Sequence, residues 1–322
     1  MGKQFDIVAL GELLIDFTPA GYSAEGMRLF EQNPGGAPAN MLTAASRFGL
    51  KTAFIGKVGD DMHGHFLKSV ISEVGIDASA IQMDASVFTT MAFVDLSETG
   101  ERNFSFARKP GADTMICYRD IDKSFLANSR IFHVGSLSLT DEPARTTTFE
   151  AVKYAKKNGT LISYDPNYRA SLWTDEEIAI IRMQSLLPYV DLMKISDEET
   201  SLLTPYQAPE DALKYLLAQG KKLVAVTLGR EGVLIGNRHT VILVKGFQTK
   251  AVDTTGAGDS FWGGVLAAFL ELKKEADELS EQELEHIGTV GNAVASLCVE
   301  KRGGISAIPD LPAIKQRLEM RS

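Results

Sequence analysis

Residues 253–264 read Asp-Thr-Thr-Gly-Ala-Gly-Asp-Ser-Phe-Trp-Gly-Gly and carry the clearest chemical signal in the sequence. Gly256 and Gly258 bracket Ala257, so the backbone can bend there and point several N–H groups in one direction. A helix that follows would add the unpaired N–H groups and positive dipole end of its first turn, which together bind anions. Asp259 would repel a phosphate held there, unless it accepts the proton of a hydroxyl group that attacks phosphorus. The segment therefore predicts a phosphotransferase, although an Asp near a helix start is also a common cap.

The complete string resembles the second signature of the ribokinase-like (PfkB) carbohydrate kinases. In that family the aspartate is the catalytic base and the Gly-Ala-Gly turn forms the anion hole. The resemblance implies that Asp259 is the base and that Gly256, Ala257 and Gly258 form the hole. It also implies an α/β fold of the ribokinase-like type, with a central, mostly parallel sheet flanked by helices and a small β-sheet lid.

A second motif, Gly35-Gly36-Ala37-Pro38-Ala39-Asn40, precedes a run of residues typical of a helix. Two glycines let a sugar lie against bare backbone, and the amide of Asn40 offers a donor and an acceptor to hydroxyls. The motif resembles the first family signature, and Asp16 matches the family's sugar-binding aspartate. The resemblance thus assigns Gly35, Gly36, Asn40 and Asp16 to the sugar. On the residues alone, the glycines could form a simple turn and Asp16 could face solvent.

The element Asp165-Pro166-Asn167-Tyr168-Arg169 follows an apolar run. In relatives of this family, an Asp-x-Asn-x-Arg element lies near the phosphates and the substrate. The resemblance implies that Asn167 helps to place the metal and the nucleotide. It also implies that Arg169 reaches the phosphates or the sugar, since the fork of a guanidinium suits phosphate geometry.

The element Lys194-Ile195-Ser196-Asp197-Glu198-Glu199 aligns with a family Asn-x-x-Glu motif that organises magnesium through water. The resemblance assigns Glu199 to the magnesium ion and Lys194 to the nucleotide. Ser196 stands where the family has asparagine. Magnesium keeps several waters and few direct protein ligands, so this single change is tolerable.

Further positions match nucleotide and cation contacts of the family. The resemblance assigns the following residues to the nucleotide: Thr227, Gly229, Gly232 and Asn292. A turn with glycine after a strand is generic, and a helix asparagine can simply be buried. Relatives supply oxygens for an activating monovalent cation, which would be K⁺, at the positions of Asp253, Thr255 and Ser306.

Short apolar runs with polar ends predict the strands that position these residues. They are Phe5–Leu10, Ile131–Val134, Leu161–Tyr164, Leu192–Ile195 and Leu223–Val226. Helical stretches such as 147–158 and 209–219 lie between them. Strands that alternate with helices of this length indicate a parallel sheet covered on both faces. Ligands bind at the carboxyl ends of such strands, where the polar residues stand.

Residues 16–34 and 86–108 break this pattern with the alternation typical of β-strands. The second segment predicts a hairpin with its turn at Glu98-Thr99-Gly100. We expect one ribokinase-like domain over residues 1–322, from which these two segments project as the lid. In the family this lid covers the sugar and often forms the dimer contact, so the resemblance implies a homodimer.

The composition excludes several other classes of protein. The net charge of −9 argues against nucleic acid or an anionic membrane as partner. No segment has the length of a membrane span, the start does not resemble a signal peptide, and the two cysteines lack metal-ligand spacing. The sequence therefore predicts a soluble, cytoplasmic protein. The sequence contains no GxxxxGK[ST] motif, which excludes a P-loop enzyme. It also contains no GxGxxG motif after a strand, which weakens the hypothesis that the protein is an oxidoreductase.

The lid sequence from Phe104 to Asp113, together with the glycine and Asp-Pro-Asn-Tyr-Arg motifs, resembles the fructokinase branch. The alternative substrate is 2-keto-3-deoxygluconate. Relatives bind its carboxylate with arginines and tyrosines at positions that resemble Arg108, Phe106 and Arg169. Because phenylalanine stands at 106, one hydroxyl is missing, and fructose is favoured.

The sequence thus predicts in-line transfer of the γ-phosphoryl group of ATP to a primary hydroxyl, O6 of fructose, with Asp259 as the base. Magnesium would bridge the phosphates. An alternative of another class is a non-catalytic sugar- or nucleotide-binding regulator on the same fold. Such a regulator would be expected to lack the base or the glycine turn, and both are intact.

Overall fold

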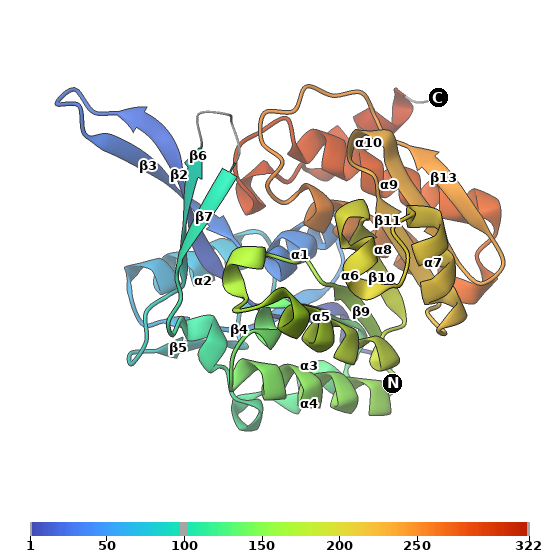
Figure 1. Cartoon of the computed structure of the whole chain (residues 1–322), viewed down its shortest axis with the longest axis horizontal. Helices are drawn as coiled ribbons and strands as arrows, with labels where there is room; N and C mark the ends of the chain where they lie inside the picture. Colours follow the sequence, from blue (N-terminus) through green and yellow to red (C-terminus); the bar gives the residue numbers. More distant parts are fainter. Residues whose placement is uncertain (1, 97–101, 321–322) are drawn as a thin grey trace.

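The structure, a computed structural model, describes residues 2–96 and 102–320. Nine strands form one sheet in the order β13-β12-β11-β10-β9-β8-β1-β4-β5 (Figure 1). Their bounds are β1 Phe5–Leu10, β4 Thr52–Gly59, β5 Ile81–Asp84, β8 Ser129–Gly135, β9 Leu161–Asp165, β10 Leu192–Ser196, β11 Leu223–Thr227, β12 Gly232–Gly236 and β13 Val241–Lys245.

In the sheet order from β11 to β5, each strand is parallel to the next one. Their residues are almost all buried, as a sheet covered on both faces requires. The predicted central, mostly parallel sheet is therefore confirmed. The chain then adds β12 and β13 as an antiparallel extension at one edge, which the sequence reading did not anticipate.

Helices pack on both faces of this sheet. Alternate residues of β1 point to opposite faces, so Ile7 and Val8 lie in different apolar cores. One layer contains α1 Ala37–Arg47, α2 Met62–Glu73, α8 Ala257–Leu272, α9 Glu281–Cys298 and, packed on α9, α10 Leu311–Glu319. The other contains α3 Lys123–Ala127, α4 Ala144–Lys157, α5 Glu176–Ser185, α6 Thr200–Leu203 and α7 Pro209–Ala218. Within the described residues, no helix combines the length and apolarity needed to cross a lipid bilayer.

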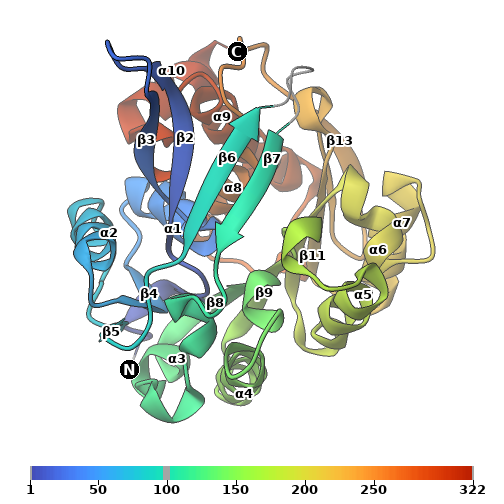
Figure 2. The same cartoon turned by 60° about the vertical axis from the view of Figure 1, so that its left-hand side comes forward.

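Four further strands form a small separate sheet in the order β3-β2-β6-β7 (Figure 2). They are β2 Leu14–Tyr22, β3 Arg28–Gly35, β6 Met91–Leu96 and β7 Arg102–Ala107. The pair β2 and β6 is parallel, while β3 and β7 pair antiparallel at the two edges. These strands lie in the two segments that the sequence set apart. The predicted turn at 98–100 lies outside the described residues.

Candidate active site

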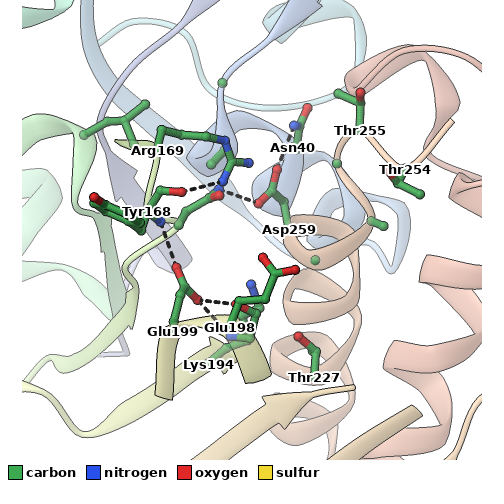
Figure 3. A pocket seen from close by; sticks show the side chains of 18 of the residues that line it. Asn40, Tyr168, Arg169, Lys194, Glu198, Glu199, Thr227, Thr254, Thr255 and Asp259 are labelled. Atoms are coloured by element: carbon green, nitrogen blue, oxygen red, sulfur yellow. Dashed lines mark hydrogen bonds between the residues drawn. The ribbon is translucent and has the colours of Figure 1, made fainter. Parts of the chain in front are cut away.

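A cavity of about 510 Å³ lies where the carboxyl ends of the central strands meet the first turn of α8 and the start of the small sheet (Figure 3). Polar side chains from distant parts of the chain line it. The residues singled out in the sequence that line this cavity are Asp16, Gly36, Asn40, Phe106, Asn167, Arg169, Lys194, Glu199, Thr227, Gly229, Thr255, Gly256, Ala257, Gly258 and Asp259.

The first turn of α8 opens on this cavity without a side-chain cap. Gly256 is the N-cap residue and has a left-handed backbone (φ 75°), which favours glycine. Its carbonyl accepts from Ser260 N at 2.8 Å and so closes the first helical turn. Trp262, which is fully buried, anchors the helix through a 2.8 Å hydrogen bond from its indole N–H to Ser163 Oγ. An uncapped helix start of this kind is a site for anions.

Asp259 lies in this turn and is held on both oxygens. Asn40 Nδ2 donates to Asp259 Oδ2 and Asn167 Nδ2 donates to Asp259 Oδ1, each at 2.9 Å (Figure 3). Burial raises the pKa of Asp259, whereas the Asn40 hydrogen bond and the charges of Lys194 and Arg169 oppose that rise. The side chain of Asp259 is therefore held in one orientation beside the uncapped helix start.

Asp16 reaches the same cavity because Gly35, which lies against its side chain in the fold, has no side chain of its own. A Cβ atom on Gly35 would collide with Asp16 Oδ2, so the carboxylate occupies the space that a side chain would fill. Burial raises the pKa of Asp16 to about 7, and the charge of Arg169 partly opposes this. Gly35 itself does not line the cavity, whereas Gly36 does. The backbone at Gly36 (φ 122°) approaches the carbonyl of Glu12 too closely for any side chain.

Glu12 is a cavity residue that sequence reasoning did not single out. It is buried, and its Oε1 accepts a 2.8 Å hydrogen bond from Ala37 N at the start of α1. Burial raises its pKa to about 7, although its backbone hydrogen bonds oppose the rise. The available signal was its place in Gly11-Glu12, directly after β1 and at the carboxyl edge of the sheet. Glu12 replaces the missing side-chain cap of α1.

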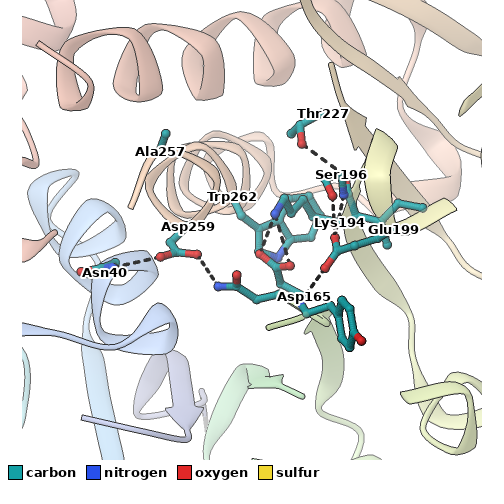
Figure 4. Close-up of polar contacts among 12 residues, drawn as sticks. Asn40, Asp165, Lys194, Ser196, Glu199, Thr227, Ala257, Asp259 and Trp262 are labelled. Atoms are coloured by element: carbon teal, nitrogen blue, oxygen red, sulfur yellow. Dashed lines mark hydrogen bonds and ion pairs between the residues drawn. The ribbon is translucent and has the colours of Figure 1, made fainter. Parts of the chain in front are cut away.

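Lys194 and Glu199 lie on the side of Asp259 that is opposite to Asn40 (Figure 4). Lys194 Nζ forms a buried ion pair with Asp165 Oδ2 at 3.0 Å. Glu199 Oε1 accepts from Tyr168 N at 2.7 Å, and its Oε2 accepts from Ser196 N at 2.8 Å. Ser196 Oγ donates to the same Oε2 at 3.1 Å, so serine supports Glu199 at the position where the family has asparagine.

Gly232 and Asn292, assigned to the nucleotide from the sequence, do not line this cavity. A side chain on Gly232 would collide with the carbonyl of Val244 on β13, and its φ is 113°. Asn292 Nδ2 donates to the carbonyls of Val244 and Lys245, both at 3.1 Å. Both residues therefore hold β13 in place, against β12 and against α9 respectively. Thr227 and Gly229, by contrast, lie in the cavity wall at the end of β11.

Arg108, assigned to the substrate from the sequence, also does not line the cavity. Its buried guanidinium pairs with Asp113 Oδ2 at 2.7 Å. It also donates to Thr140 Oγ1 at 2.8 Å and to the carbonyl of Leu137 at 2.9 Å. The physical reason is that a carboxylate five residues along the chain neutralises the arginine locally. The side chain of Phe104 lies outside the described residues.

Asp253 and Thr255 meet in the loop before α8. Asp253 Oδ1 accepts from Thr255 N at 2.8 Å, and Asp253 Oδ2 accepts from Gly303 N at 3.2 Å. Ser306 follows three residues after Gly303 in the chain and lies close to it. Of these residues only Thr255 lines the cavity. Among the described residues, no group of three His, Cys, Asp or Glu side chains is placed to hold a metal ion.

Similar proteins are known from sequence. The chain is 40% identical over 316 residues to "Probable fructokinase-5" of Arabidopsis thaliana, covering 97% of this chain and 96% of that protein. It is 38% identical to "Fructokinase-2" of Oryza sativa subsp. japonica, covering 97% of this chain and 93% of that protein. The similarity therefore extends over nearly the full length of both relatives.

Solved structures resemble the fold over the same extent. A fructokinase from Xylella fastidiosa with bound ATP has a TM-score of 0.89 and 30% identity, with 98% of both chains covered. A fructokinase from Vibrio cholerae O395 with fructose, ADP and a calcium ion has a TM-score of 0.87 and 32% identity, with 98% of this chain and 99% of that chain covered. The protein family described as "pfkB family carbohydrate kinase" matches residues 4–311 of this chain. The chain belongs to the pfkB family of carbohydrate kinases.

Proposed function

We propose that this carbohydrate kinase is an ATP-dependent fructokinase that forms fructose 6-phosphate. One observation carries the proposal: Asp259, oriented by Asn40 and Asn167, stands in the uncapped first turn of α8 inside the cavity. A general base and an anion site are thereby adjacent, which is what phosphoryl transfer to a hydroxyl group requires. The similarity to fructokinases, including one solved with fructose and ADP, supports the choice of sugar.

In the proposed reaction, Asp16, Asn40 and the backbone at Gly36 bind the sugar hydroxyls. Asp259 accepts the proton of O6 as that oxygen attacks the γ-phosphorus of ATP. The new O6–P bond forms while the bond from phosphorus to the β-phosphate oxygen breaks, and the electron pair of that bond leaves with ADP. The N–H groups around residues 256–258 stabilise the charge on the phosphoryl oxygens during transfer.

The nucleotide would lie along Lys194, Thr227 and Gly229, with Asn167 close to its phosphates. Magnesium fits the acidic wall at Glu198 and Glu199, since it prefers oxygen ligands and keeps most of its waters. Both oxygens of Glu199 already accept hydrogen bonds, which suits contact through water rather than direct ligation. When bound, this ion would neutralise charge on the phosphates of ATP.

A potassium ion is proposed beside the loop that joins Asp253 to Thr255. A Vibrio cholerae fructokinase was solved with fructose, ADP and a potassium ion bound. Asp253 already orders the N–H groups of Thr255 and Gly303, which draws two loops together there. Carbonyl oxygens of such loops are suitable ligands for a monovalent cation, and Ser306 lies in the short 3-10 helix Ile305–Ala307 just after Gly303.

The contacts of Arg108 favour fructose over 2-keto-3-deoxygluconate as the proposed substrate. An acid substrate would need a cation for its carboxylate, but the guanidinium of Arg108 is already paired with Asp113. Phe106, which lines the cavity, offers no hydroxyl. Of the two arginines, Arg169 then remains for that task, and its charge also acts on Asp16 and Asp259. A neutral sugar fits this arrangement better.

The small sheet is proposed to act as a lid on one domain that spans residues 1–322, and as the contact surface of a homodimer. Asp16 and Phe106 reach the cavity from β2 and β7. The exposed large apolar side chains of the small sheet and its β2–β3 turn are Tyr22, Met27, Leu29, Phe30 and Phe93. Such a surface is typical of a protein contact. A cytoplasmic location fits an enzyme that consumes ATP and has two free thiols.

The test is ADP formation from ATP and magnesium with fructose, 2-keto-3-deoxygluconate, ribose, glucose, adenosine or no sugar. Fructose-dependent turnover far above all others is expected. A preference for the keto-deoxy acid would keep the chemistry of Asp259 and overturn the choice of sugar. No turnover with any sugar would instead favour a binding regulator, and a thermal shift with NAD would point to an oxidoreductase.

A further inference from the structure

Lys194 lies directly beneath the first turn of α8. A Cβ atom on Gly258 would stand 2.9 Å from Lys194 Nζ, so the absent side chain leaves room for the ammonium group. Only 6% of the Lys194 side chain and 5% of the Asp165 side chain are exposed, and the two form an ion pair at 3.0 Å (Figure 4). Lys194 also lines the cavity, whereas Asp165 does not. The pair is thus oriented, with its positive end toward the cavity.

Three carboxylates surround this ammonium group. Asp165, Glu199 and Asp259 each act on it electrostatically; burial opposes its charge, but these carboxylates prevail and raise the pKa of Lys194. Without Lys194, a phosphoryl group that arrives in the cavity would meet the negative charge of Glu199 and that of Asp259, on which Arg169 would be the remaining cation to act. Repulsion of that kind is strong in a buried site, where the effective dielectric constant is low.

We propose that Lys194 lies beneath the anion hole, where its ammonium group stabilises the phosphoryl group during transfer. Asp165 positions that ammonium group. This inference rests on the proposed function. It assigns Asp165 a role in catalysis through Lys194, which the sequence motif did not suggest. It also accounts for glycine at 258, since a larger residue there would separate the ammonium group from the helix turn.

A purely structural ion pair would give the same contacts, so the experiment must separate charge balance from catalysis. The variants are Lys194→Met, Asp165→Asn and the double variant. Lys194→Met leaves Asp165 buried without its partner, which should lower Tm strongly, whereas removal of both charges should restore much of that loss. The distinguishing measurement is kcat in the double variant, measured below its Tm.

If Lys194 acts on the transferred group, Lys194→Met lowers kcat by about 10²-fold or more, the scale of one lost electrostatic contact in a transition state. The double variant then recovers Tm but keeps the low kcat, and the KM for fructose changes by less than about threefold. Asp165→Asn, which keeps the ammonium group but holds it loosely, should lower kcat by less than Lys194→Met. Recovery of both Tm and kcat in the double variant would overturn the proposal.

The ion pair of Lys156 and Asp191, at 2.7 Å, supplies the matched control. Neither residue lines the cavity, so Lys156→Met with Asp191→Asn should leave kcat unchanged. The unmodified enzyme in the same assay tests the proposed function separately. If it prefers another sugar, the choice of fructose fails, while the ratio of kcat values between variants is measured with that sugar and still decides the role of Lys194.

Discussion

Asn167 Nδ2 donates to Asp259 Oδ1 at 2.9 Å, although the two residues are 92 positions apart in the chain. Asn167 has a left-handed backbone (φ 48°), a conformation that asparagine tolerates better than most residues. The turn after β9 therefore aims its amide at the start of α8. With Asn40 on the other oxygen, Asp259 cannot rotate freely, and its position relative to an incoming hydroxyl is set before a substrate binds.

Asp259→Asn is expected to lower kcat by roughly 10²–10⁴-fold, the usual scale of general acid–base catalysis. The KM for fructose should change little, because Asp16 and Asn40 remain. Steady-state kinetics of ADP formation, with fructose varied at saturating ATP, measure both parameters. Turnover near that of the unmodified enzyme would rule out Asp259 as the base.

Gly35→Ala should raise the KM for fructose, because the new Cβ would displace the carboxylate of Asp16. Overpacking of this kind costs about 1–3 kcal/mol, which as a loss of binding free energy would be roughly 5- to 160-fold in affinity. Gly159→Ala is the control, since φ is +71° there and nothing lies within 4 Å of the added atom. The control should lower Tm through backbone strain alone, and an equal rise in its KM would contradict the steric explanation.

Asp16 should make the stability of the free enzyme fall as pH rises. Burial raises its pKa from 3.8 to about 7, so the folded state keeps a proton that the unfolded state loses. Stability from this group is fully present below about pH 4 and is lost as pH rises toward about 7. We therefore compare the Tm of the unmodified enzyme with that of the Asp16→Asn variant in thermal melts without ligand. The first Tm minus the second should decrease from pH 4 to pH 8. A constant difference would show that folding does not shift the pKa of Asp16, and an increasing one that folding lowers it; either would contradict the prediction.

Arg108→Met should act on stability rather than on substrate binding. It leaves Asp113 buried without its cation, which typically costs about 3–5 kcal/mol of unfolding free energy. Kinetic constants measured well below Tm should stay within about threefold of the original values. The double variant with Asp113→Asn should regain Tm. A tenfold rise in KM without loss of Tm would return Arg108 to the substrate site.

Phe30→Asp should dissociate the proposed dimer. Phe30 is 39% exposed and packs edge-on against Phe93, so a charge there disrupts the apolar surface of the small sheet. Light scattering after size exclusion would measure the mass. Leu243→Asp is the control, because this side chain is 54% exposed on β13 in the other sheet. A monomer before any substitution, or equal effects of both variants, would exclude this interface.

The central strands were predictable because strands buried on both faces are continuous apolar runs, as in Leu223–Val226 of β11. The antiparallel pair β12 and β13 was not, since β12 is short and has glycine at both ends. Residues 271–285 are rich in charge, which is typical of a solvated helix with a turn. They instead join two helices: Lys273 ends α8 with a left-handed backbone, and Ser280 starts α9 with a capping box.

The sequence places residues near a site more easily than it orients them. Arg108 follows a strand that reaches the site, but only the folded chain shows that its guanidinium pairs with Asp113. Asn292 was aligned with a family position, yet its amide is bound to the carbonyls at the end of β13. Glu12 was not singled out from the other polar strand ends, because a single acidic residue after a strand has no distinctive spacing.

The open first turn of α8 has a consequence for how the enzyme responds to acidity. Backbone N–H groups do not titrate, so their attraction for an anion is the same at pH 6 as at pH 8. A phosphate monoester, in contrast, loses its second proton near pH 6. A change in the affinity for phosphorylated ligands across this range would therefore report the ionisation of the ligand together with that of Asp16 and Glu12, whose pKa values are raised to about 7, and not a change at the helix end.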